Sequence, residues 1–143
     1  YSHGQKNEVR KYQPFKDSLA DVEGLVHMPP GKWATFAEGY EYKGQPLLLT
    51  EFGGIGYKVG GQAGWGYTTA ENDEQYLEDY ARIMTAIFDS KALWGYCYTQ
   101  LTDVEQEING ILTYDRQPKV DLAKIKEIND SYFPERINLR GQW

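Results

Sequence analysis

The chain has 143 residues, a length that suits one ordinary domain, and its apolar and charged fractions are those of a globular protein. Fifteen basic and 21 acidic residues give a formal net charge of −6, which argues against binding to nucleic acid or to an anionic membrane surface, because both need a basic patch. No apolar run approaches the ~20 residues of a membrane span, and the N-terminal residues lack the apolar core of a signal peptide. Since the chain does not begin with Met, we expect it to be a processed or excised piece, and its localisation stays open.

Cysteine and histidine are too few for a disulfide framework or a metal site. Cys97 is the single cysteine, and His3 and His27 show no ligand spacing. We expect Cys97, which stands between two tyrosines, to be a small core residue, and we predict no metal and no other cofactor. Aromatic residues are abundant instead, with 12 Tyr and 4 Trp, and many lie in glycine-containing stretches such as GWGY at 64–67. Aromatic rings on loops suit flat ligand faces such as sugar rings, although covering hydrophobic surface is the simpler role for any one of them.

The first half of the chain contains one predicted helix and one predicted strand. Apolar residues at helical spacing predict a short amphipathic helix from about Phe15 to Val26, and MPPG at 28–31 ends it. Residues 32–46 read as a loop. Leu47 to Thr50 is a continuous apolar run, typical of a strand covered on both faces in a parallel sheet. Residues 52–67 contain seven glycines and are predicted to form a long loop.

The second half repeats the order of helix and strand. Asn72 and Gln75 have the spacing of a capping box, and the residues after them carry an apolar face, formed by Leu77, Tyr80, Ala81, Met84, Ile87 and Phe88. Ala92 to Tyr98 reads as a second buried strand. A polar loop, a brief strand or turn at 111–115 and a last helix that begins at Pro118 follow.

This alternation predicts an α/β fold with a parallel sheet. Only two strands are convincing, whereas a closed (β/α)₈ barrel takes roughly 250 residues. We therefore expect residues 1–143 to be a single partial domain, a fragment of a (β/α)₈ TIM barrel. A two-stranded sheet has two open edges, through which the chain could also associate with another copy.

Carboxylates follow both predicted strands, where α/β folds carry their chemistry. Glu51 comes directly after the first strand, and Asp103, Glu105 and Glu107 come after the second. Glycosidases need two such groups, one as nucleophile or base and one to protonate the leaving oxygen. The residues alone leave two roles open for Glu51, because a strand-end Glu also accepts backbone N–H bonds or pairs with Arg. For the other three, a solvated loop is the simpler interpretation.

Two motifs, TEFGG at 50–54 and GYCYTQLTDVEQEINGILTYDRQPK at 95–119, resemble the C-terminal end of the catalytic barrel of glycoside hydrolase family 2, which includes β-galactosidases, β-glucuronidases and β-mannosidases. The resemblance covers the chain from about Pro46 to Asn129. It implies that the chain contains roughly the last two βα units of the barrel, and that Glu51 is the nucleophile of a retaining β-glycosidase. Tyr98 occupies the position of an aromatic residue that lines the sugar subsite. We take Trp65, Gln100 and Asp103 as further candidates for substrate binding.

The resemblance also implies what this chain lacks. The acid/base glutamate of the family follows an Asn upstream, at the end of the fourth strand, whereas Asn7-Glu8 lies in a polar N-terminal stretch. We therefore expect the acid/base to be missing and the isolated chain to be inactive. Glucuronidases carry an Asn-x-Lys motif where this chain has Asn109-Gly110-Ile111, so a neutral sugar such as galactose is the expected substrate. The alternative is an aromatic-rich module that binds carbohydrate without cleaving it.

Overall fold

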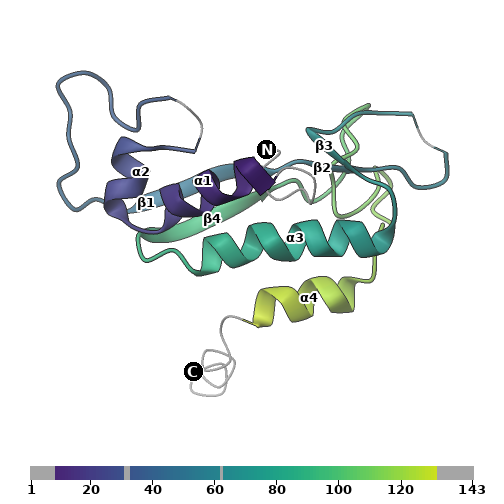
Figure 1. Ribbon diagram of the computed structural model, residues 1–143. Coiled ribbons are helices and arrows are strands. Elements are labelled where there is room, and N and C mark those ends of the chain that lie inside the picture. The colour runs from purple at the N-terminus through teal and green to yellow at the C-terminus, as the bar shows by residue number, and fades with distance from the viewer. Residues whose placement is uncertain (1–8, 31–32, 62, 132–143) are drawn as a thin grey trace, which may run out of the picture.

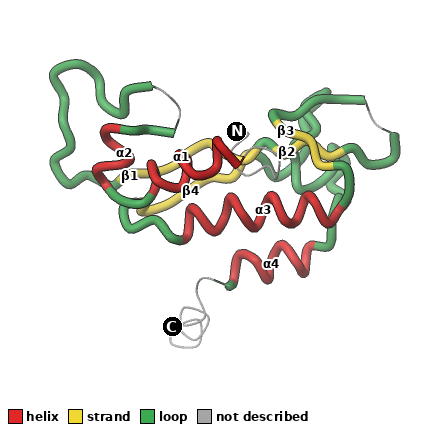
Figure 2. The backbone as a smooth tube through the Cα atoms, viewed as in Figure 1, coloured by secondary structure: helices red, strands yellow, loops and turns green. Residues whose placement is uncertain are grey.

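The computed structural model describes residues 9–30, 33–61 and 63–131 (Figure 1). In chain order the elements are helices α1 (Val9–Leu19) and α2 (Val22–His27), strands β1 (Leu47–Gly53), β2 (Ile55–Tyr57) and β3 (Thr68–Ala70), helix α3 (Asp73–Phe88), strand β4 (Leu93–Thr99) and helix α4 (Leu122–Asp130). The order is thus two helices, three strands, a helix, a strand and a helix, as the tube in Figure 2 shows. No helix among these residues is long and apolar enough to cross a membrane.

Strands β1 and β4 form the main sheet. They run parallel, with Leu47 opposite Leu93 and Gly53 opposite Thr99, and α3 makes the crossover between them (Figure 1). A parallel pair requires such a crossover, because a tight turn can join only antiparallel strands. Both strands lie where they were predicted, and β1 continues three residues beyond Thr50. The prediction that they are buried, the first of them on both faces, is wrong, since Leu48 is exposed and most of β4 is only partly buried.

The glycine-rich stretch 52–67 is not wholly a loop. It contains β2, which pairs in parallel with β3 to form a second small sheet. The two backbones approach so closely here that a Cβ on Gly66 would lie 2.5 Å from the Cα of Gly56. Glycine usually weakens a strand, so the glycine content predicted a loop. Here the glycines instead allow the two backbones to approach each other closely.

The predicted helix from Phe15 to Val26 is wrong in its middle, because the chain breaks between α1 and α2. Asp21 caps α2, and its Oδ1 accepts a hydrogen bond of 2.9 Å from the N–H of Gly24. Gly24 itself packs on the end of α1, where a Cβ would lie 2.7 Å from the carbonyl oxygen of Ser18. The apolar spacing ran through the break because both helices bury residues, among them Phe15, Leu19 and Leu25, in one core.

Helix α3 begins as predicted. The Oδ1 of Asn72 accepts a hydrogen bond of 2.9 Å from the N–H of Gln75, whose side chain bonds back to the N–H of Glu71. The last helix is shorter than predicted, because α4 begins after Asp121, which caps it, and not at Pro118.

Within the described residues, one face of the main sheet is covered and the other is open. Helices α1 and α3 contact each other over the covered face, and the core cluster joins them to β1 through Leu47 and Phe52. On the other face, Leu48 is 59% exposed and lies next to Gly95. Cys97 is exposed as well, so the prediction that it is a core residue is wrong. Since residues along a strand alternate between faces, Cys97 points away from Tyr96 and Tyr98, which pack toward α3.

The N-cap of α3 gives a direct test of this helix start. Replacing Asn72 with Ala should lower the free energy of unfolding by about 1 kcal/mol, because the N–H of Gln75 loses its acceptor. Asn72→Asp keeps an acceptor and is the matched control. Urea unfolding measures both, and equal midpoints for Asn72→Ala and the wild type would contradict the cap.

Candidate functional site

The carboxyl ends of β1 and β4 lie at the same end of the main sheet, and Glu51 stands near that end. The pairing register shifts between Leu49 and Phe52, so Glu51 belongs to an irregular stretch of β1. Such irregularities re-aim side chains and are frequent next to active sites. The Glu51 side chain is exposed, and none of the described residues gives its carboxylate a hydrogen bond or an ion pair. This favours a free carboxylate over the structural role that the sequence left open.

The turn after Glu51 is built from two glycines in left-handed conformations, with φ of 106° at Gly53 and 73° at Gly54. The N–H of Gly54 donates a hydrogen bond of 2.8 Å to the carbonyl oxygen of Thr99. A Cβ on Gly53 would lie 2.5 Å from the Tyr98 ring, so no other residue fits there without moving the ring. The turn therefore fixes the end of β1 against the end of β4.

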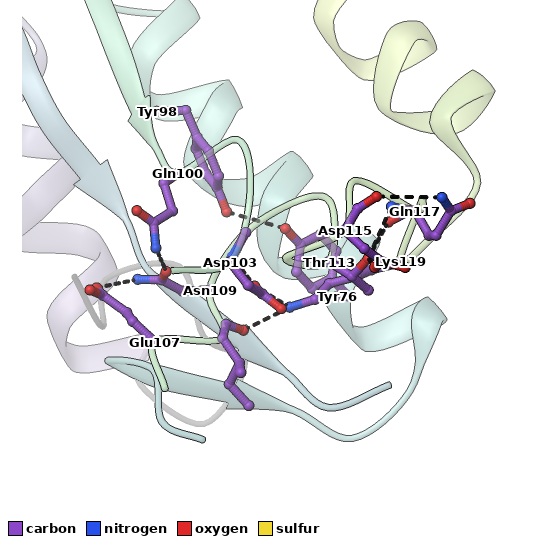
Figure 3. A network of polar contacts seen from close by, with 12 residues as sticks. Tyr76, Tyr98, Gln100, Asp103, Glu107, Asn109, Thr113, Asp115, Gln117 and Lys119 are labelled. Carbon is purple, nitrogen blue, oxygen red and sulfur yellow. Dashed lines mark hydrogen bonds and ion pairs between the residues drawn. The ribbon is translucent and has the colours of Figure 1, made fainter. Parts of the chain in front are cut away.

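Tyr98, a candidate sugar-binding residue, lies with its ring against the core. The ring makes edge contacts with Phe52 and Tyr80, at centroid distances of 5.5 and 5.1 Å. Its hydroxyl lies 3.5 Å from the hydroxyl of Tyr76 (Figure 3). Burial raises the pKa of the Tyr98 hydroxyl well above its ordinary value, and the neighbouring Tyr76 raises it further. These contacts favour a packing role for Tyr98 over stacking on a sugar.

Trp65 lies on the loop between β2 and β3, and its ring is half exposed. The ring packs edge-on against Tyr67 at 5.5 Å. Two backbone hydrogen bonds of 2.8 Å, to Gln106 and from Ile108, attach Trp65 to the loop that follows β4. The loops after β1 and β4 are thereby joined, and Trp65 stays partly exposed where they meet.

Gln100 and Glu107 are brought together by Asn109, which the sequence analysis compared only with the Asn-x-Lys motif of glucuronidases. Asn109 is fully buried, and its Oδ1 accepts a hydrogen bond of 2.6 Å from Gln100 Nε2. Its Nδ2 donates one of 2.9 Å to Glu107 Oε1 (Figure 3). The sequence does not predict these hydrogen bonds, because the partners of Asn109 lie nine and two positions before it on an irregular loop.

Asp103, another candidate for substrate binding, is buried in an ion pair. Its Oδ1 accepts hydrogen bonds from Lys119 Nζ at 2.7 Å and from the N–H of Gly110 at 2.8 Å. Lys119 Nζ also donates to the carbonyl oxygen of Ile108 at 2.9 Å (Figure 3). Burial lowers the pKa of Lys119, and the hydrogen bond to Asp103 opposes that shift. Asp103 therefore holds the loop together, whereas the neighbouring Glu105 is exposed.

A cavity of about 400 Å³ lies elsewhere, between α2 and the segment before β1, and Val22, Val26, Phe36 and Tyr42 are among its lining residues. Helix α2 sits at the end of the main sheet opposite to β2 and β3 (Figure 1), so this cavity is separate from Glu51. In the part of the chain that the structure describes, no three His, Cys, Asp or Glu side chains gather closely enough to hold a metal ion.

We predict that Lys119→Met lowers the free energy of unfolding by about 3 kcal/mol or more, because it leaves the Asp103 carboxylate buried and unpaired. Adding Asp103→Asn should recover part of that loss, since the amide carries no charge and still accepts from Gly110. Lys124→Met, at an exposed position of α4, is the control. Urea midpoints decide, and a Lys119→Met midpoint equal to that of the control would contradict the role of the pair.

The neighbouring hydroxyls of Tyr76 and Tyr98 predict that the fold loses stability at alkaline pH. Burial raises the pKa of the Tyr76 hydroxyl above its ordinary value of 10.0, so the folded chain keeps a proton that the unfolded chain releases. Stability should be complete below about pH 10 and fall as pH rises above it. In Tyr76→Phe the urea midpoint should drop less between about pH 8 and about pH 11 than in the wild type. The pKa of Lys119 is shifted in the opposite direction, but equally in the wild type and in Tyr76→Phe. The difference between their two midpoint drops therefore reports Tyr76 alone. Equal drops would contradict the assignment.

Comparison of the chain with protein-family models and with curated proteins finds no match. The resemblance to glycoside hydrolase family 2 therefore rests on the two sequence motifs alone.

Proposed function

We propose that the chain forms part of the catalytic barrel of a retaining β-glycosidase, with Glu51 as its nucleophile. The observation that carries this proposal is the Glu51 carboxylate, which is exposed and lacks a partner among the described residues at the carboxyl end of β1. A nucleophile needs a free oxygen within reach of substrate, and in barrel enzymes it stands at this end of the sheet.

The arrangement of the elements supports a barrel fragment. Strands β1 and β4 are neighbours joined through α3, and α1 and α3 pack on the same face of the sheet. A (β/α)₈ barrel has helices outside and side chains filling its interior. The open face with Leu48 and Cys97 corresponds to that interior. The outer edges of β1 and β4, which pair with no strand among the described residues, correspond to the positions of neighbouring strands. The same edges would pair with a second copy if the chain associates with itself.

The proposed reaction has two steps. A carboxylate oxygen of Glu51 bonds to the anomeric carbon while the bond from that carbon to the leaving oxygen breaks. A carboxylic acid from outside this chain protonates the leaving oxygen and, as carboxylate, then removes a proton from water. The resulting hydroxide attacks the anomeric carbon and releases Glu51. The lack of an acid/base motif in the sequence supports this division, and the buried ion pair of Asp103 makes it unsuited to the acid role.

A carbohydrate-binding module is the alternative, and the half-exposed Trp65 ring favours it. Flat aromatic faces bind sugar rings without any catalytic group. Binding to the isolated chain that disappears in Trp65→Ala and persists in Glu51→Ala would support this alternative.

The test of the proposal is hydrolysis of aryl β-glycosides by this chain and by the full-length polypeptide that contains it. Only the full-length polypeptide should turn over. Glu51→Gln should lower its kcat by about a thousandfold or more, because the amide cannot form the covalent intermediate. Glu71→Gln, at another exposed glutamate, should leave kcat unchanged.

A 2-deoxy-2-fluoro aryl β-galactoside should trap the intermediate, and peptide mass spectrometry should locate the added sugar on Glu51. Normal turnover by Glu51→Gln, or a label on another residue, would refute the proposal. Turnover by the short chain alone would refute the division between the two parts.

A further inference from the structure

We propose that Gln100 and Glu107, oriented by Asn109, form a pair of hydrogen-bond acceptors that binds two hydroxyl groups of a neutral sugar beside Trp65. The inference rests on the proposed glycosidase function and assigns its sugar class to particular residues. On the sequence alone, Glu107 was weighed as one of three carboxylates after the second strand, with a solvated loop as the simpler interpretation, and Asn109 was given no role of its own.

The hydrogen bonds fix the direction of each group. A carboxylate only accepts hydrogen bonds, so the atom of Asn109 that faces Glu107 Oε1 must be the donor Nδ2. The carbonyl Oδ1 of Asn109 then faces Gln100, which must present its donor Nε2. The acceptor Oε1 of Gln100 is consequently turned away from Asn109. The network thus settles both amide orientations through the charge of Glu107.

Two acceptor atoms remain available on the outer side of this network. Glu107 Oε2 and Gln100 Oε1 have no hydrogen-bond partner among the described residues, and both side chains are partly exposed. Asn109, fully buried behind them, uses both ends of its amide. Side chains held in this way lose little further conformational freedom when a ligand binds.

An aromatic ring stands next to the acceptors. Trp65 and Glu107 are partners in a parallel β-bridge, and side chains of residues paired in this way project to the same face. Trp65 is 50% exposed, and its ring packs edge-on against Tyr67. A sugar presents C–H groups on one face and hydroxyl groups at its rim, so a ring beside two acceptors matches both parts.

The charge of Glu107 selects among sugars. Hydroxyl groups donate to the two acceptors, and a hydrogen bond to a charged group is stronger than one between neutral groups. A uronic acid would bring its carboxylate toward Glu107, and the two negative charges would repel each other. The surface therefore fits a neutral hexoside and disfavours the corresponding uronide.

Binding to the full-length polypeptide with Glu51→Gln, whose kcat is expected to be too low to consume the ligand during the measurement, tests this inference. Calorimetry should give tighter binding of methyl β-galactoside than of the matching methyl β-galacturonide. Adding Glu107→Gln should weaken the galactoside by about tenfold or more and leave the galacturonide no weaker, because the variant removes both an acceptor and the repelling charge. Adding Glu105→Gln, an exposed carboxylate two residues away, should leave both affinities unchanged.

Gln100→Met provides a second variant, which removes one acceptor without changing charge. It should weaken the galactoside by several-fold and shift the preference between the two sugars less than Glu107→Gln does. Circular dichroism of each variant verifies folding before binding is measured.

The inference would be overturned if the Glu51→Gln polypeptide bound the two sugars equally or bound neither. It would also be overturned if adding Glu107→Gln had no more effect than adding Glu105→Gln. The glycosidase proposal is judged separately, by trapping at Glu51. A preference for galactoside that depends on Glu107, in a protein that forms no trapped intermediate, would uphold the acceptor pair and reject the catalytic role of Glu51.

Discussion

The buried ion pair between Asp103 and Lys119 is the constraint on which the surface after β4 depends. The loop from Gln100 to Lys119 contains no helix and only isolated β-bridges, and it carries several charged side chains. It keeps one shape because the Asp103 carboxylate collects Lys119 and the N–H of Gly110 at a single oxygen. Buried charges are tolerated only when they are paired and hydrogen-bonded in this way. Gly110 is required as well, since a Cβ there would overlap the backbone of Asp103.

That shape has consequences for the neighbouring loop. With Ile108 and Asn109 fixed, the backbone at 106–108 makes hydrogen bonds with the backbone of Trp65 and Tyr57. The loop after β1 thus takes its position from the loop after β4, although more than 40 residues separate them. Glu51, the Trp65 ring and the polar groups around Asn109 are consequently carried by one connected framework. In the proposed enzyme, this framework would set the geometry of the substrate surface before substrate arrives.

Sequence patterns predicted what depends on local periodicity and missed what depends on distant contacts. The leucine run of β1, the apolar segment of β4 and the capped start of α3 were all predicted, because burial and capping leave marks within a few residues. The break between α1 and α2 was missed, since Asp21 and Gly24 interrupt the backbone without interrupting the apolar spacing.

The candidate site was predictable only in part. Glu51 was chosen as a candidate from its place after the leucine run, whereas β1 continues through it to Gly53. Asp103 read as one charge among several on a solvated loop, because its partner Lys119 lies 16 residues away and nothing in the spacing links them. Asn109 was hidden for the same reason. Tyr98 was assigned to a sugar subsite from its position at the strand end, whereas the structure turns its ring toward Tyr76 and Tyr80.

The open face of the main sheet carries a thiol whose reactivity reports whether that face is covered. Cys97 lies on that face and is the only thiol of the sequence. While the face is bare, the sulfur is accessible to alkylating reagents, and any strand or partner that comes to cover β4 will shield it. The rate of alkylation at this one atom therefore distinguishes an isolated chain from one enclosed in a larger structure, whatever the enclosing structure proves to be.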